Sequence, residues 1–319
     1  MRILIIKTSS LGDIVHCFQG MLECHLHRPE IIFDWVVEKP FAELPQLLPN
    51  VKKIITTDVR QWRKKPFQAT TRKAFKSSLR ELREHSYDLT IDAQGLIRTA
   101  FLGYLSRPNI FYGHGKKTML HDAYRMKESP GRYFYHHVVN VPERHLPSQF
   151  RKFIGSILQY PFDLNKSYFL TPSKRYKDSK TILLFPNTSC VKKTWGRWNE
   201  LTKELNLKGF KVCVINGSEK EYLNNQKKIP EARNLPPTSI MDVKQLIEAS
   251  KLCIGVDTGL THLACILKHP CVSLYRENVN TPDVGAIYHE NNKIIHQDLA
   301  SLEVGRVYDA VLPLLDSVK

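Results

Sequence analysis

The feature that most constrains the fold is a repeated alternation of short apolar runs with longer amphipathic segments. In the first half of the chain, apolar and β-branched runs predict strands at Arg2–Ile6, Ile31–Val37, Val51–Ile55 and Leu89–Ala93. Segments with helical periodicity lie between them, at Leu11–His25 and Lys73–Glu84. Strands that alternate with helices in this way predict a parallel sheet covered by helices.

The alternation weakens between Ser106 and Lys180, a stretch rich in aromatic, histidine, proline and basic residues, and then restarts. The predicted strands are Thr181–Phe185, Lys211–Asn216, Leu252–Val256 and Cys271–Leu274. The predicted helices are Leu201–Leu207, Val243–Ser250, Leu263–Leu267 and Glu303–Val318. We therefore expect two α/β domains, with a boundary between about residues 155 and 180.

Length and composition agree with this organisation. The 319 residues suffice for two domains, and 42% hydrophobic with 24% charged residues is the balance of a folded globular protein. No apolar run is long enough to cross a bilayer, and the N-terminus is apolar only as far as Lys7, so we expect a cytoplasmic protein. The seven cysteines lack metal-type spacing and are interpreted as buried, reduced thiols.

The strongly basic charge points to an anionic partner without identifying it. The formal net charge is +16. Nucleic acid, acidic lipid and phosphorylated sugar all satisfy this charge. A solvated basic face without a partner remains open.

Polar motifs follow two predicted strands of the first domain. Segment 7–13, Lys-Thr-Ser-Ser-Leu-Gly-Asp, comes directly after the first strand. Ligands bind at the carboxyl ends of parallel strands, where a helix start offers N–H groups to an anion. Asp13 can there take a proton from an attacking hydroxyl, although the helix macrodipole alone also favours a carboxylate in a first turn. The turn Asp92–Gly95 ends a strand at the same edge and includes Gln94, which can donate and accept hydrogen bonds.

Three polar turns follow strands of the second domain. The turn after Phe185 contains hydroxyl residues and Lys193, which suit a phosphate. The lysine can offset negative charge on a departing diphosphate. The alternative interpretation of this turn is a polar surface loop. The turn Asp257–Gly259 precedes a helix and predicts a diphosphate cradle, with His262 within reach of sugar hydroxyls. The segment Asn216–Glu221 offers an acidic group to ribose hydroxyls, and equally fits a helix capping box.

Taken together, these motifs resemble glycosyltransferase family 9, the lipopolysaccharide heptosyltransferases. The similarity follows the order of the family pattern through the opening segment 2–13, the Asp92–Gly95 turn, Lys193–Trp195 and Val256–His262. The segments Phe33–Glu38 and Arg60–Lys64 are also similar to the family. The Lys-Thr-Ser-Ser start is more typical of its type I members than of type II.

The resemblance implies an α/β GT-B fold, with two Rossmann-like domains facing across a cleft. It implies an acceptor-binding domain at 1–160, an ADP-heptose-binding domain at 175–303, and a final helix, 304–319, that packs back on the N-terminal domain. The implied reaction is an inverting transfer of L-glycero-D-manno-heptose from ADP-L-glycero-D-manno-heptose to the first Kdo of Kdo2-lipid A, with no cofactor and no metal. The expected location is the cytoplasmic face of the bacterial inner membrane, as a peripheral protein on its anionic surface, with no nucleic-acid partner.

Motif matching also assigns roles to residues. Asp13 is expected to be the general base, and Lys193 to act catalytically on the leaving group. The residues expected at the donor are Thr188, Ser189, Lys193, Glu221, Thr238, Asp257, Thr258, Gly259 and His262, with Glu219 as an alternative to Glu221 for the ribose. The residues expected at the acceptor are Ser10, Gly12, Arg60, Arg63, Lys64 and Gln94. Tyr275–Asn278 departs from the family's Tyr-Gly-Pro-Thr-like turn, so nucleotide contacts of that turn are not carried over.

The basic cluster Arg60–Lys65 precedes the helix at Lys73–Glu84 and is followed by Pro66, which predicts a loop. We expect this cluster to bind the Kdo carboxylates and lipid A phosphates and to hold the protein at an anionic membrane. The basic residues on the helix itself are interpreted as a solvated face.

Two other functions remain open at this point. A different family 9 transferase, such as a type II enzyme, would use another acceptor. A basic RNA- or membrane-binding α/β protein without activity would explain the charge, but not the polar motifs at strand ends in both domains. An NAD-dependent oxidoreductase is disfavoured because no G-x-G-x-x-G turn follows a strand.

Overall fold

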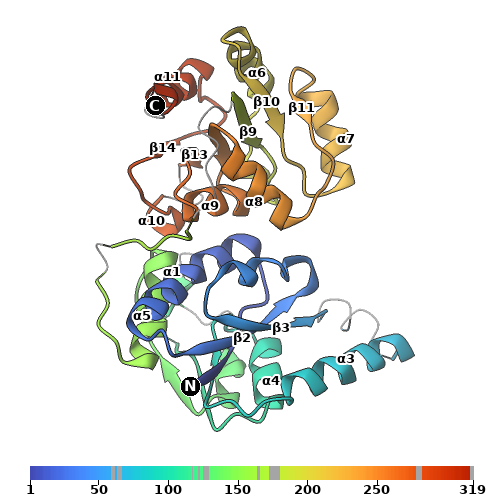
Figure 1. The fold of residues 1–319 in the computed structure, drawn as a ribbon, viewed down its shortest axis with the longest axis vertical. Coiled ribbons are helices and arrows are strands. Elements are labelled where there is room, and N and C mark those ends of the chain that lie inside the picture. Colours follow the sequence, from blue (N-terminus) through green and yellow to red (C-terminus); the bar gives the residue numbers. More distant parts are fainter. Residues whose placement is uncertain are drawn as a thin grey trace. The chain divides into compact units, whose positions relative to one another are not determined.

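The computed structural model describes residues 1–58, 62, 67–116, 118–120, 123–124, 129–163, 166–171, 180–277 and 282–316. The chain divides into two compact units, Met1–Tyr168 and Phe169–Lys319 (Figure 1). The division falls inside the range of about 155 to 180 in which the sequence predicts the domain boundary.

The N-terminal unit is built on a parallel sheet with the strand order β3-β2-β1-β4-β5-β8. Its strands are β1 (Arg2–Ile6), β2 (Ile32–Glu38), β3 (Val51–Thr57), β4 (Leu89–Asp92), β5 (Ile110–His114) and β8 (His137–Val139). A small antiparallel pair, β6 (Met119–Leu120) and β7 (Ala123–Tyr124), stands apart. The strand order reverses between β1 and β4, and the loops that leave this switch point are where a doubly wound sheet binds ligands.

Helices cover both faces of this sheet. They are α1 (Leu11–His27), α3 (Ala69–Leu82), α4 (Ile97–Leu105) and α5 (Leu146–Leu158), with short 3₁₀ turns η1 (Lys39–Phe41), η2 (Leu44–Leu47) and η3 (Ser129–Phe134). Helices α1 and α5 lie side by side (Figure 1), and Phe18 of α1 packs edge-on against Trp35 of β2. On the other face, Leu82 of α3 and Leu102 of α4 join Leu4 in one buried cluster. Successive side chains of β1 therefore point to opposite, equally apolar layers, which explains its unbroken apolar sequence.

The C-terminal unit repeats the plan with the strand order β11-β10-β9-β12-β13-β14, all parallel. Its strands are β9 (Thr181–Phe185), β10 (Lys211–Val214), β11 (Arg233–Asn234), β12 (Leu252–Val256), β13 (Cys271–Arg276) and β14 (Asn292–Gln297). Its helices are η4 (Val191–Lys193), α6 (Trp198–Leu207), α7 (Glu219–Lys228), α8 (Ile240–Ala249), α9 (Gly259–Ile266), α10 (Pro282–Gly285) and α11 (Val304–Asp316). Here the order reverses between β9 and β12.

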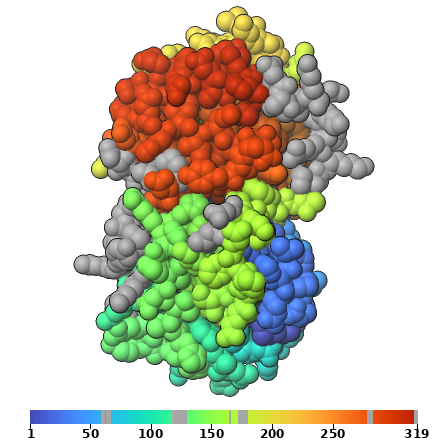
Figure 2. Space-filling model, turned by 90° about the vertical axis from the view of Figure 1, so that its left-hand side faces the viewer, coloured from blue at the N-terminus to red at the C-terminus, as the bar shows by residue number. Residues whose placement is uncertain are grey.

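The final helix, α11, belongs to the C-terminal unit. Val307, Val311 and Leu314 of α11 are buried in the same apolar cluster as the strands and α6. Figure 2 shows α11, in dark red, over one face of this unit. The apolar face of this helix lies in the core of its own unit, where it covers strands β13 and β14. That the helix also packs on the N-terminal domain stays a prediction.

The structure also bears on the expected state of the cysteines, on metal sites and on membrane-spanning helices. Six cysteines are buried and Cys190 is partly exposed, and all seven are free thiols, which confirms the interpretation of most of them as buried and reduced. In the described ranges, no three His, Cys, Asp or Glu side chains gather as a possible metal site. No helix in those ranges is long and apolar enough to span a membrane.

Candidate active site

Two loops meet at the switch point of the N-terminal sheet. The loop after β1 is held by Gln94, in the loop after β4, whose Oε1 accepts the backbone N–H groups of Thr8 at 3.1 Å and Ser9 at 3.2 Å. The carbonyl oxygen of Thr8 accepts the backbone N–H of Glu38 at 3.0 Å. The side-chain oxygen of Gln94, predicted at the acceptor, thus braces the loop that leads to Asp13.

A buried carboxylate shapes the turn that carries Gln94. Oδ1 of Asp92 accepts the backbone N–H groups of Gln94 at 2.8 Å and Gly95 at 3.1 Å. Its Oδ2 accepts the hydroxyls of Thr99 at 2.9 Å and Tyr135 at 2.8 Å. Burial raises the pKa of Asp92, while these four hydrogen bonds oppose that shift. Gly95 has φ +74°, a conformation that favours glycine. Sequence reasoning missed Thr99 and Tyr135, because hydroxyls far along the chain give no local signal.

Asp13 lies in the first turn of α1 and is partly buried. Its Oδ2 accepts both the backbone N–H and the hydroxyl of Ser10, the N-cap residue, at 3.1 Å each. The helix-start explanation for this carboxylate is therefore correct, and the same contacts orient Asp13 at the carboxyl edge of the sheet. Ser10 is exposed and Gly12 is partly buried in the same turn.

An ion pair joins the two loops at the switch point of the C-terminal sheet. The Nζ of Lys193, in η4 after β9, lies 2.8 Å from Oδ2 of Asp257, which follows β12. Nε2 of His262 lies 3.1 Å from the other carboxylate oxygen. Only 16% of the Lys193 side chain and 7% of the Asp257 side chain are exposed. Burial alone would raise the pKa of Asp257, but its hydrogen bond with His262 and the positive charges of His262 and Lys193 hold that pKa below its usual range.

The helix start beside this cluster has the geometry of an anion site. Thr258 is the N-cap of α9, and Gly259 is the first residue of that helix. Both residues are partly exposed, directly after the buried Asp257. The first N–H groups of a helix have no intrahelical acceptor, so they can bind phosphate oxygens.

Three asparagines tie together the loops after β9 and β10. Nδ2 of Asn225, buried in α7, lies 2.8 Å from Oδ1 of both Asn187 and Asn216. Nδ2 of Asn216 donates to the carbonyl of Leu235 at 2.8 Å. Asn187 immediately precedes Thr188, so this network sets the position of the predicted donor loop. Asn225 was missed because an asparagine in a polar helix looks like a surface residue.

The predicted donor residues on these loops share a hollow. Thr188 and Glu221 both line a cavity of about 550 Å³ between the loop after β9 and α7. Thr188 is partly buried, and its Oγ1 accepts the backbone N–H of Cys190 at 3.3 Å. Ser189 is exposed beside it. The structure thus brings Thr188 and Glu221 together, as a nucleotide site requires.

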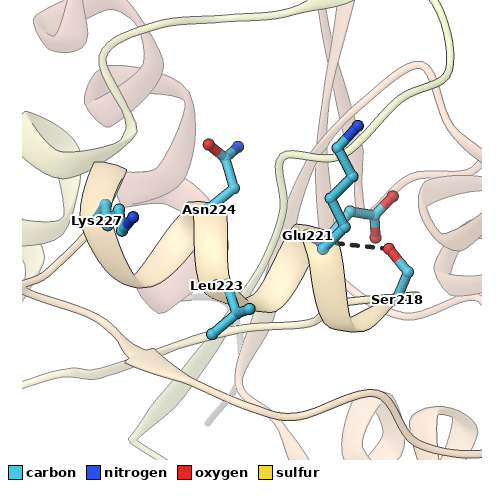
Figure 3. A pocket seen from close by; sticks show the side chains of 6 residues that line it. Ser218, Glu221, Leu223, Asn224 and Lys227 are labelled. Carbon is cyan, nitrogen blue, oxygen red and sulfur yellow. Dashed lines mark hydrogen bonds between the residues drawn. The ribbon is translucent and has the colours of Figure 1, made fainter.

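Glu221 also organises the start of α7. Its Oε2 accepts the backbone N–H of Gly217 at 2.8 Å, and its own N–H donates to Oγ of Ser218 at 3.3 Å. Figure 3 shows Glu221 and Asn224 on one side of α7 and Leu223 on the other, in a second hollow of about 540 Å³. Glu219, the alternative ribose ligand, is exposed. Glu221 therefore caps the start of α7 and also lines a hollow in which it can contact a ligand.

Thr238 makes a local contact, and the basic residues predicted at the acceptor are outside the part of the chain that the structure describes. Thr238 is exposed, and its hydroxyl donates to Oδ2 of Asp242 at 3.1 Å, beside the start of α8. Arg60, Arg63 and Lys64 lie outside the described residues. Their described neighbour Trp62 packs edge-on against Phe75 of α3, with ring centroids 5.4 Å apart.

The sequence matches a known family across most of its length. A model of glycosyltransferase family 9 (heptosyltransferase) matches residues 75–307. The chain is 30% identical over 285 residues to lipopolysaccharide heptosyltransferase 1 of Pseudomonas aeruginosa, covering 86% of this chain and 78% of the relative. It is 30% identical over 290 residues to lipopolysaccharide heptosyltransferase 1 of Escherichia coli K12, covering 86% of this chain and 88% of the relative.

Solved structures agree. The E. coli heptosyltransferase WaaC with ADP superposes with a TM-score of 0.85 at 26% identity, covering 98% of this chain and all of that one. The E. coli ADP-heptose heptosyltransferase II, at 20% identity and a TM-score of 0.77, shares the fold. These matches identify the two doubly wound units as the GT-B fold predicted from the sequence. The chain is therefore a glycosyltransferase, and it belongs to glycosyltransferase family 9, the heptosyltransferases.

Proposed function

We propose that this glycosyltransferase transfers L-glycero-D-manno-heptose from ADP-L-glycero-D-manno-heptose to the first Kdo of Kdo2-lipid A, in synthesis of the lipopolysaccharide inner core. The names of the relatives and the ADP bound to WaaC support this reaction. The observation that carries the proposal is the cluster of Lys193, Asp257 and His262 at the switch point of the C-terminal sheet. It combines a cation for phosphate with a carboxylate and an imidazole for sugar hydroxyls.

On the donor side, the cluster lies beside the start of α9. The backbone N–H groups at Thr258 and Gly259 bind the diphosphate, and Lys193 neutralises charge as ADP departs. Asp257 and His262 hold hydroxyls of the heptose. Because Asp257 stays ionised, it can accept hydrogen bonds from two sugar hydroxyls while remaining paired with Lys193.

The nucleoside part of the donor extends along the loops after β9, β10 and β11. Thr188 and Ser189 contact the diphosphate with their hydroxyls, and Glu221 accepts the ribose hydroxyls. The hollow of about 550 Å³ that Thr188 and Glu221 line supports this placement. Thr238, at the start of α8, stays a proposal for adenine.

On the acceptor side, Asp13 takes the proton of the attacking hydroxyl. The hydroxyl oxygen forms a bond to the anomeric carbon of the heptose as the bond from that carbon to the phosphate oxygen breaks. One in-line displacement of this kind inverts the anomeric configuration, and the electron pair leaves with ADP. Two contacts from Ser10 to one oxygen of Asp13 keep the carboxylate in a fixed orientation, as a general base requires.

We assign the lipid A phosphates, the carboxylate of the second Kdo and the membrane surface to the basic cluster Arg60–Lys65, with Ser10, Gly12 and Gln94 nearer the reacting hydroxyl. The adjoining helix supports this role. Trp62, Phe75 and Leu79 line an apolar groove of about 510 Å³ that Arg72 and Lys76 border. Apolar surface edged by cations suits the boundary between lipid headgroups and acyl chains.

Mass spectrometry of Kdo2-lipid A after incubation with ADP-heptose tests the proposal. We expect one added heptose, linked to the first Kdo, and released ADP in equal amount. An acceptor that already carries the first heptose separates the alternatives, since a type II enzyme would extend it and leave Kdo2-lipid A unchanged. Hydrolysis or binding of ADP-heptose with no product on either acceptor would refute the proposed reaction.

A further inference from the structure

Lys7 is a buried cation for which the described residues provide no counterion. It follows β1 directly, only 4% of it is exposed, and its backbone carbonyl accepts the indole N–H of Trp35 at 3.0 Å. In the described part of the chain its ammonium makes no ion pair or hydrogen bond; it lies over the ring of Phe150, 5.2 Å from the centroid. Burying an ammonium without an anion is strongly unfavourable, so such a group points to a ligand that supplies the negative charge.

A second unsatisfied polar group lies close to Lys7. His114 ends β5, is only 1% exposed, and its Nδ1 has no hydrogen-bond partner among the described residues. Its ring stacks on Phe153, with centroids 3.9 Å apart. Burial lowers the pKa of His114 to about 3, and the charge of Lys7 contributes to that shift. The imidazole is therefore neutral at pH 7, and Lys7 is the only charge that the pair presents.

Both groups lie near the reacting edge of the N-terminal sheet. Lys7 directly precedes the loop that Gln94 braces, and Gly95 of the neighbouring turn abuts His114. The charges of Lys7 and Asp13 both act on the thiol of Cys17, which lies one helical turn after Asp13. Lys7 and the proposed general base thus stand at the same end of α1.

We propose that Lys7 is the binding point for the carboxylate of the acceptor sugar, and that the neutral His114 beside it accepts a hydrogen bond from a hydroxyl of the same sugar through its Nδ1, which has no partner among the described residues. This inference rests on the proposed function, in which the acceptor is a sugar acid. A single buried cation that lies over the ring of Phe150, with a neutral imidazole close by, matches a singly charged carboxylate. A phosphate, which carries more charge, would need further cations. The ion pair would fix the sugar so that its hydroxyl faces Asp13.

The test compares Lys7→Met and wild type on two acceptors, Kdo2-lipid A and the same molecule with the carboxylate of its first Kdo converted to a carboxamide. We expect wild type to lose about 10- to 100-fold in kcat/KM on the amide, as for a lost charged hydrogen bond. On the native acceptor, the kcat/KM of Lys7→Met should be lower than that of wild type by a similar factor. On the amide it should fall no further, and the variant should bind ADP as wild type does. Lys52→Met, at an exposed lysine of β3, is the matched control and should behave as wild type.

Folding provides an independent readout. Because the described residues give Lys7 no counterion to lose, Lys7→Met should melt at the same temperature as wild type or higher. A clear drop would show a structural pairing and overturn the proposal. The proposal would also be overturned if the ratio of kcat/KM on the native acceptor to kcat/KM on the amide were the same in Lys7→Met and wild type. The proposal would also fail if the loss of kcat/KM in Lys7→Met disappeared on an acceptor without lipid A phosphates but persisted on the carboxamide. Lys7→Gln repeats both comparisons with a neutral polar side chain and should give the same results as Lys7→Met. Failure of the proposed function is separate, since wild type would then not use the native acceptor.

Discussion

The ammonium of Lys193 lies 2.8 Å from a carboxylate oxygen of Asp257, although the two residues follow different strands. Those strands, β9 and β12, are the neighbours at which the order of the C-terminal sheet reverses. The N-terminal sheet has a corresponding contact at its own reversal, where Gln94 holds the loop that begins at Lys7. Each unit thus joins its two central loops, and the proposed catalytic residues lie on or beside those joined loops.

Lys193→Ala should lower kcat strongly and ADP affinity less, because the ammonium matters most when negative charge develops on the leaving diphosphate. A loss of about 10²–10³-fold in kcat is expected for one stabilising group of this kind. Steady-state kinetics and calorimetric titration with ADP measure the two effects. Lys192→Ala is the control, because Lys192 is exposed in the same turn. Unchanged kcat and ADP affinity in Lys193→Ala would reduce Lys193 to a surface residue and direct attention to Lys192.

Asp257→Asn should change how stability depends on pH. The folded-state pKa of Asp257 lies below its unfolded value of about 3.9, so its stabilising effect is present above about pH 4 and is lost as the pH falls through the folded value. The free energy of unfolding of Asp257→Asn should therefore be lower than that of wild type at pH 7, with a difference that shrinks below about pH 4. Urea titrations across this range measure it. A difference that grows on acidification would contradict the ion-pair assignment.

Asp13→Asn should lower turnover by about 10²–10⁴-fold, the usual contribution of a general base. The asparagine oxygen can still accept from Ser10, so the helix start and ADP binding should survive. Turnover, ADP affinity and the melting temperature are to be measured together. Wild-type turnover at neutral pH in a folded variant would exclude Asp13 as the base.

Asn225→Ala should weaken ADP binding although Asn225 lies in a helix behind the donor loops. The change removes a donor from the buried oxygens of Asn187 and Asn216, at a cost of about 1–3 kcal/mol, and loosens the loop with Thr188. We expect about tenfold weaker ADP binding, equivalent to ~1.4 kcal/mol. Gln226→Ala, at an exposed neighbour in α7 that lines neither hollow, is the control for helix stability. ADP affinity equal to wild type would show that the network supports the fold alone.

Reversing Arg60, Arg63 and Lys64 to glutamate should raise the acceptor KM and abolish binding to anionic vesicles, while ADP affinity stays unchanged. Wild-type vesicle binding should weaken with salt, because exposed charges are screened. Kinetics at low salt and vesicle sedimentation test these effects. An unchanged acceptor KM would place the docking surface elsewhere in the N-terminal unit.

Much of the fold follows from local pattern. Runs such as Thr181–Phe185 and Leu252–Val256 are apolar at every position because helices cover both faces of the sheet, and the predicted bounds of both strands are confirmed. Strand β14 was missed, because Asn292–Gln297 is an edge strand with polar, partly exposed positions. Helix α5 was missed because its buried face mixes Gln149 and Arg151 with apolar residues.

By itself, the sequence determined that polar turns follow the central strands, because hydrophobic periodicity and turn residues are local properties of the chain. It thereby determined which segments can carry chemistry. The tertiary structure decided which of these segments touch. The pairing of Lys193 with Asp257, and the burial of Lys7 next to His114, depend on the order in which the strands lie in each sheet. That order results from packing between distant segments, whose contacts leave no pattern in either segment alone.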